Sequence, residues 1–230
     1  MFGVISAGLS TIGGAISAAI GGALGSACGA IGEVLRPVLS MRERIITTAL
    51  NIIGGIGKIF NLIPWQANIE SDMTELGARV EKCDVKSDEF ASAKDYINHL
   101  RNNIDISREE INTISDDKKK LHQILGASLI AKGISENYTM AIPASFWAEA
   151  ALSSLSSGQV KKMLEGYQAL DMPADLKSFS ERSLSLADNK SVYGLLADAL
   201  KEEDSDTTPQ TPEDLITQRY GDYQQGGQRA

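Results

Sequence analysis

The feature that most constrains this sequence is its first 32 residues, which contain no Asp, Glu, Lys or Arg. The run is built mainly from Gly, Ala, Ser, Ile and Leu, and at helical spacing its small residues line two adjacent edges. A surface of small residues spaced by four lets helix backbones approach closely inside a bilayer. The residues that define this helix-packing edge are Gly14, Ala18, Gly21, Gly22, Gly25 and Gly29.

In water the same run would be a poor helix. Each interior Gly costs about 1 kcal/mol relative to Ala, and the sequence offers almost none of the polar face that a surface helix needs. At about 1.5 Å per residue, its length exceeds the roughly 30 Å of a hydrocarbon core. The run therefore predicts a membrane-inserting or self-associating helix. The alternative is a helix buried at the centre of a large core.

A second apolar segment, Ile45–Ile63, follows a polar bend at residues 33–44. Pro37 lies in this bend, where it removes a backbone donor and disfavours helix at the preceding residue. Two apolar segments joined by a bend predict a membrane-inserting helical hairpin over residues 1–64, and an ordinary pair of buried helices is the alternative. Trp and long basic side chains favour membrane–water interfaces. The interface residues expected here are Arg36, Arg42, Arg44, Lys58 and Trp65.

Residues 66–125 are charged and carry one narrow apolar stripe with a heptad period. A heptad stripe has two apolar positions, and the second of them shifts by three residues relative to the first near residues 84–90. This shift indicates either a stammer in a continuous coiled coil or a helix break. Ser107 and Glu110 have the spacing of a capping box, which allows another break there. So narrow a stripe needs a partner, from this chain or from another copy, and we expect a homo-oligomer. The predicted oligomer seam consists of Ile69, Leu76, Cys83, Phe90, Ile97, Ile104 and Ile111.

The rest of the chain divides into a helical part and a polar tail. Gly126 and Gly133 indicate a joint, and residues 126–200 contain short amphipathic segments that predict a small helical cap. Residues 201–230 are acidic and polar, which predicts a disordered, flexible tail. Thr211–Pro212 is a good helix start, so a short helix that folds on a virion or secretion-complex protein is the alternative to plain fraying. No segment has a convincing strand pattern, and the predicted fold class is all-α.

Composition and the scarcity of reactive clusters exclude several functions. A net charge of −8 over 230 residues, with 6% aromatic residues, argues against nucleic-acid recognition. Cys28 and Cys83 have no CxxC spacing, so a zinc site is not supported and a structural disulfide is not expected. His99 and His122 lie far apart, which favours surface histidines over a reactive pair. The glycines do not follow the phosphate-binding pattern, and we expect no enzyme, no cofactor and no metal.

The opening residues MFGVISAGLSTIGGAISAAIGGAL resemble the Gly/Ala-rich N termini of phage DNA-pilot and ejection proteins. In the small single-stranded-DNA phages, the pilot protein continues into long helices, which assemble as a tube that carries DNA across the envelope. The resemblance covers about the first 30 residues, together with the order of an apolar start before a coiled coil. Fusion peptides and pore-forming toxins share this composition.

The resemblance implies a membrane-penetrating delivery protein that is held in a virion or larger assembly and becomes membrane-associated after delivery. Such a protein would oligomerise and insert its glycine-rich hairpin into a target bilayer as a channel. Two other functions fit the same residues: an α-helical pore-forming toxin or secreted effector, and a structural membrane anchor of a larger complex. Ion conductance separates the first two functions from the anchor, which forms no channel.

Overall fold

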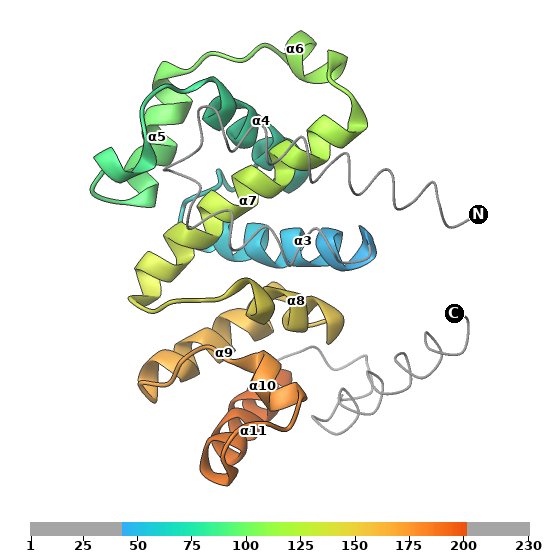
Figure 1. The fold of residues 1–230 in the computed structure, drawn as a ribbon, viewed down its shortest axis with the longest axis vertical. Coiled ribbons are helices and arrows are strands. Elements are labelled where there is room, and N and C mark those ends of the chain that lie inside the picture. Colours follow the sequence, from blue (N-terminus) through green and yellow to red (C-terminus); the bar gives the residue numbers. More distant parts are fainter. Residues whose placement is uncertain (1–42, 202–230) are drawn as a thin grey trace, which may run out of the picture. The chain divides into compact units, whose positions relative to one another are not determined.

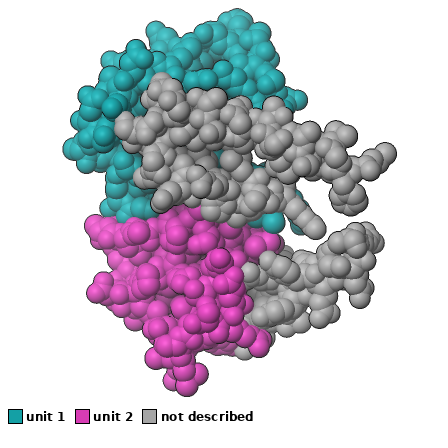
Figure 2. Space-filling view, in the orientation of Figure 1, with its two compact units in different colours: residues 1–137 teal, residues 138–230 magenta. Residues whose placement is uncertain are grey.

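The computed structural model describes residues 43–201, and its regular elements are all helical (Figure 1). Nine α-helices and one short 3-10 helix occur in these residues, and no strand occurs among them. The predicted all-α fold is therefore confirmed for this range. The chain separates into two compact units, with the division between Asn137 and Tyr138 (Figure 2).

Several helices of unit 1 begin at a side chain that caps the first turn. Asn68, Ser92 and Ser107 each accept a hydrogen bond from a backbone N–H of the helix that follows. These caps satisfy donors that have no partner inside the helix. The elements are α3 (Glu43–Ile59), α4 (Ile69–Lys82), η1 (Ser87–Glu89), α5 (Ala93–Asn103), α6 (Arg108–Thr113) and α7 (Asp116–Tyr138).

Helices α4 and α7 cross with their backbones in contact (Figure 1). A Cβ atom added at Gly77 of α4 would lie 1.9 Å from the carbonyl oxygen of His122 in α7. One added at Gly126 of α7 would lie 2.2 Å from the carbonyl oxygen of Met73 in α4. Each helix thus contributes a glycine that leaves room for the backbone of the other.

The apolar face of α3 is buried in the core of unit 1. Ile52, Ile53 and Ile56 are almost fully buried. Gly57 of α3 leaves room for Ile130 of α7, since a Cβ there would lie 2.7 Å from the isoleucine side chain. The second half of the predicted hairpin is therefore a core helix in this structure. Its first half lies outside the described residues.

The predicted joint at Gly126 and Gly133 is wrong, because both glycines lie inside α7. Each costs the helix about 1 kcal/mol relative to Ala, but each also permits a close contact that a larger residue would prevent. A Cβ at Gly133 would lie 2.8 Å from the side chain of Leu62. The C-terminal unit accordingly begins at Tyr138 rather than at Gly126.

Unit 2 is a set of short helices around an aromatic core. Phe146 makes edge-to-face contacts with Trp147 and Tyr167, at centroid distances of 5.5 and 6.0 Å. All three rings are buried. The short helices predicted for this part of the chain are present. The elements are α8 (Ala144–Leu152), α9 (Ser157–Ala169), α10 (Leu176–Ser180) and α11 (Leu186–Leu200).

Candidate functional site

The residues predicted to meet a membrane fall partly within the described range. Arg44 is exposed at the start of α3, Lys58 is half-buried near its end, and Trp65 is 71% exposed in the loop that follows. Among the helices of residues 43–201, none has the length and apolar character needed to cross a bilayer. The membrane hairpin therefore stays a prediction. Outside the described residues lie Gly14, Ala18, Gly21, Gly22, Gly25, Gly29, Arg36 and Arg42, and also the predicted tail.

The predicted seam residues are distributed over α4, α5, α6 and the loops between them. Residues 66–125 therefore form several helices rather than one. Leu76, Cys83 and Ile97 are buried, so this part of the stripe finds its partners within the chain. Association with another copy stays a prediction. The half-buried seam residues are Ile69, Phe90, Ile104 and Ile111.

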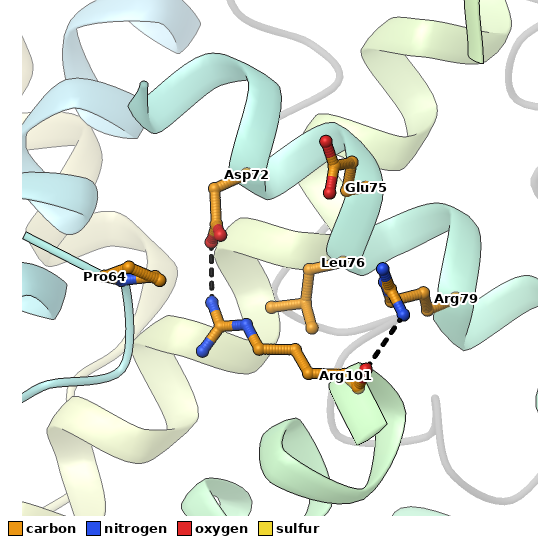
Figure 3. A pocket seen from close by; sticks show the side chains of 6 residues that line it. All are labelled: Pro64, Asp72, Glu75, Leu76, Arg79 and Arg101. Atoms are coloured by element: carbon orange, nitrogen blue, oxygen red, sulfur yellow. Dashed lines mark hydrogen bonds and ion pairs between the residues drawn. The ribbon is translucent and has the colours of Figure 1, made fainter. Parts of the chain in front are cut away.

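A cluster of charged side chains ties α4 to the C-terminal end of α5 (Figure 3). The Asp72 carboxylate accepts a hydrogen bond from Arg101 Nη2 at 2.7 Å. Arg79 Nη1 donates to the carbonyl oxygens of Leu100 and Arg101 at 3.2 Å each, and also to that of Ile104. A cation is favourable there because the last carbonyls of a helix have no intrahelical donor.

This cluster borders a half-open cavity of about 250 Å³ (Figure 3). Burial raises the pKa of the Asp72 carboxyl above its ordinary value, although the Arg101 guanidinium acts in the opposite direction. Both guanidinium groups at the cavity already donate to acceptors of the protein itself, so the arrangement is a clamp between helices. The lining residues are Pro64, Asp72, Glu75, Leu76, Arg79 and Arg101.

A second polar cluster lies at the α4–α7 crossing. His122 Nε2 is 2.9 Å from Glu81 Oε2, and Lys118 Nζ is 3.0 Å from the same oxygen. Burial acts to raise the pKa of Glu81, but hydrogen bonds from Lys118 and His122 outweigh it and hold that pKa below its ordinary value. His122 is 2% exposed, so the expectation of a surface histidine was wrong at this position. The absent side chain of Gly77 lets His122 approach this closely.

Among the described residues of unit 2, one acidic side chain is buried. Glu149 of α8 is 6% exposed and accepts a hydrogen bond from Ser180 Oγ of α10 at 3.3 Å. Two buried donors of unit 2, Trp147 Nε1 and the Tyr167 hydroxyl, have no hydrogen-bond partner among the described residues. Burial raises the pKa of Tyr167 well above its ordinary value, and the charge of Asp175 adds to this effect. The pair formed by Glu149 and Ser180 holds two helices together.

Sequence reasoning missed both clusters of unit 1, although part of the signal was present. Asp72, Glu75 and Arg79 are spaced by three and four, which places them on one face of a helix. Their partner Arg101 is a helix away, and nothing in its own spacing pointed to them. The described residues contain no group of three His, Cys, Asp or Glu side chains arranged to hold a metal ion. No family model, curated protein or solved structure matches the chain.

Proposed function

We propose that the protein is a membrane-penetrating delivery protein, which oligomerises and inserts its apolar N-terminal region into a target bilayer. The observation that carries this proposal is the charge-free run of residues 1–32, with small residues recurring every four positions. A membrane anchor needs only a hydrophobic segment, whereas an edge of small residues also allows helices to pack closely against one another. The protein is held in a virion or larger assembly before delivery and is membrane-associated afterwards.

Helix α3, the second apolar segment of the predicted hairpin, is part of the core of unit 1. In α3 the largest apolar side chains, including Ile52 and Ile56, are already used in the core of unit 1. Removing a buried isoleucine from such a core forfeits about 1.5–3 kcal/mol of apolar transfer free energy. Residues 1–32 can therefore enter a bilayer at lower cost than α3. We assign them the first step of insertion, and α3 follows only if it leaves α4 and α7.

Liposome flotation tests this assignment. The full chain should float with the lipid, and a chain that begins at Glu43 should stay at the bottom. The truncation is placed before α3 because removing that helix would expose the core of unit 1. A full-length chain with Ala18→Asp and Gly22→Asp is the matched control, since a carboxylate at the bilayer centre costs about 2.5–3.5 kcal/mol. Equal flotation of all three chains would overturn the proposal.

The same edge of small residues also fits a pore-forming toxin or secreted effector, and it argues against a simple anchor. Single-channel recording with purified protein in a planar bilayer separates a delivery channel or a toxin from an anchor. Discrete conductance steps are expected for a delivery channel and for a toxin. Flotation without conductance would identify the protein as a membrane anchor.

A further inference from the structure

The half-open cavity between α4 and α5 is lined by four charged side chains, of which two form an ion pair (Figure 3). Asp72 and Arg101 neutralise each other at 2.7 Å. Arg79 donates to backbone carbonyl oxygens rather than to a carboxylate. Glu75 is half-buried and makes no hydrogen bond or ion pair with any described residue. The lining therefore keeps one guanidinium and one carboxylate that have no partner of opposite charge within the described range.

Glu75 and Arg79 are four residues apart in α4, a spacing at which Glu and Arg can form an ion pair along a helix. They do not form it, because the guanidinium of Arg79 reaches the end of α5. A guanidinium has five N–H donors on three nitrogens. Arg79 donates only through Nη1 and Arg101 only through Nη2 to the described residues. The cavity thus has N–H donors left for an anionic group and a carboxylate left for a cationic group.

Exposed apolar side chains adjoin this cavity in the chain. Pro64 belongs to the lining, and the next residue, Trp65, is 71% exposed. Ile59, the last residue of α3, is 41% exposed. Trp favours the membrane–water interface, where its ring lies at the level of the lipid headgroups. A charged cavity one residue away from an exposed indole therefore suits a charged group that is presented at a membrane surface.

We infer that the cavity binds a zwitterionic lipid headgroup of the phosphatidylethanolamine type. The phosphate accepts hydrogen bonds from the remaining N–H groups of Arg79 and Arg101, since guanidinium groups match phosphate oxygens well. The ammonium donates to the carboxylate of Glu75. An anion without an ammonium would leave Glu75 unmatched, and the quaternary ammonium of phosphatidylcholine has no N–H to donate. This inference adds a headgroup preference to the proposed membrane function, on which it rests for access to lipid.

The first test uses soluble headgroups with the full chain. Glycerophosphoethanolamine and glycerophosphocholine are titrated while the side-chain Nε–H signals of Arg79 and Arg101 are followed by nuclear magnetic resonance. Both signals should shift in a saturable way, and the ethanolamine compound should bind about threefold more tightly, as a partly screened ion pair allows. Equal affinity for the two compounds, or unshifted arginine signals, would overturn the inference.

The variant that isolates the ammonium contact is Glu75→Gln, which keeps the size of the side chain and removes its charge. The fold should be unaffected, because Glu75 has no hydrogen-bond or ion-pair partner among the described residues. This variant should bind the two compounds equally. Glu109→Gln, a change at an exposed residue of α6 outside the cavity lining, is the matched control and should keep the parent preference. A preference that persists in Glu75→Gln contradicts the assignment of the ammonium to this carboxylate.

The second test separates a lipid from a free zwitterion. The full chain is mixed with vesicles of phosphatidylcholine alone, or of phosphatidylcholine and phosphatidylethanolamine in equal parts. The chain has two tryptophans, and Trp147 is buried, so the emission lost in Trp65→Phe reports on Trp65. This emission should move to shorter wavelength at about threefold less lipid with the mixed vesicles. Glu75→Gln should remove the difference.

The two tests also separate this inference from the proposed function. Flotation with phosphatidylcholine alone reports on the N-terminal run, whereas the difference between the two vesicle types reports on the cavity. If the chain floated with neither vesicle, the proposed function would fail, and the arginine signals would still decide whether the cavity binds the headgroup. Binding of the soluble headgroup, with the same Trp65 response to both vesicle types, would overturn lipid as the source of the ligand.

Discussion

The two units reach a packed core in different ways. In unit 1, α4 and α7 approach until Gly77 and Gly126 touch the opposing backbone, so nothing at the crossing can move aside for an added atom. In unit 2 the core is filled by large rings. At Gly166, the atoms nearest to an added Cβ belong to the flexible side chain of Leu195, which can shift. Unit 1 should therefore be sensitive to added volume, and unit 2 to lost volume.

The largest expected effect is the loss of an aromatic ring in unit 2. Phe146→Ala should destabilise this unit by about 3–5 kcal/mol, because the buried ring leaves a cavity between its two aromatic neighbours. Hydrogen exchange read by mass spectrometry should show faster exchange in α8, α9 and α11. Exchange in α4 and α7 should be unchanged. Equal acceleration in both units would show that the two units unfold together.

The next effect is the addition of one methyl group at the α4–α7 crossing. Gly77→Ala should destabilise unit 1 by about 1–3 kcal/mol, because the new Cβ meets a backbone oxygen. Gly194→Ala in α11 is the matched control, since nothing lies within 4 Å of a Cβ there. That change should stabilise unit 2 by up to about 1 kcal/mol, through helix propensity alone. If the denaturant midpoint shifts in the same direction for both variants, relative to the parent, the close crossing is contradicted.

A smaller effect concerns the hydroxyl groups of two buried tyrosines. The Tyr167 hydroxyl has no partner among the described residues, whereas the Tyr138 hydroxyl donates to the carbonyl of Lys161 at 3.4 Å. Tyr167→Phe should be neutral or stabilising by up to about 1 kcal/mol, since it removes an unmet polar group. Tyr138→Phe should destabilise by about 0.5–1.5 kcal/mol. Urea unfolding of both variants checks the difference, and a larger loss for Tyr167→Phe would indicate a missed partner.

The smallest effect is electrostatic and depends on pH. The pKa of Glu81 is lowered in the folded chain, so its stabilisation is present above its ordinary pKa of 4.5 and is lost as pH falls through the folded value. Glu81→Gln should lower the stability of unit 1 at pH 7 by a few tenths to about 1 kcal/mol, because the partly exposed pair is screened.

Parent and variant should become equally stable at low pH, and high salt should also reduce their difference. Glu109→Gln, a change at an exposed residue of α6, controls for the loss of a negative charge. A difference that grows as the pH falls would show that the carboxylate destabilises the fold.

The sequence could predict the role of a residue where its contacts are near in the sequence, but not where they come from a distant part of the chain. The cap at Ser107 was visible, because its partner Glu110 is three residues away. Gly126 was misjudged. Its low helix propensity can be seen from the local sequence, whereas the close packing that it permits involves Met73, far away in the chain. The burial of His122 was missed for the same reason, since its backbone packs against Gly77, which is far away in the chain.

The cluster of charged side chains between α4 and α5 could also be predicted only in part. Asp72 and Arg79 share a helix face that periodicity reveals, but their acceptors and donors on α5 depend on how that helix folds back. Periodicity also predicted the stripe of residues 66–125, and it could not say that α4 and α5 would cover part of it. The helical class could be predicted because no segment has the alternating pattern of a strand.

We propose that small residues in the N-terminal run pack helices together inside a bilayer. Dye leakage from liposomes tests it directly with two full-length variants: Gly21, Gly25 and Gly29 changed to Leu, and Ala19, Ala23 and Ala27 changed to Leu. Both variants gain apolarity, so both should still float. The glycine variant should leak less than the parent, because Leu separates the helix backbones, and the alanine variant should leak like the parent. Parental leakage from both variants would contradict the claim.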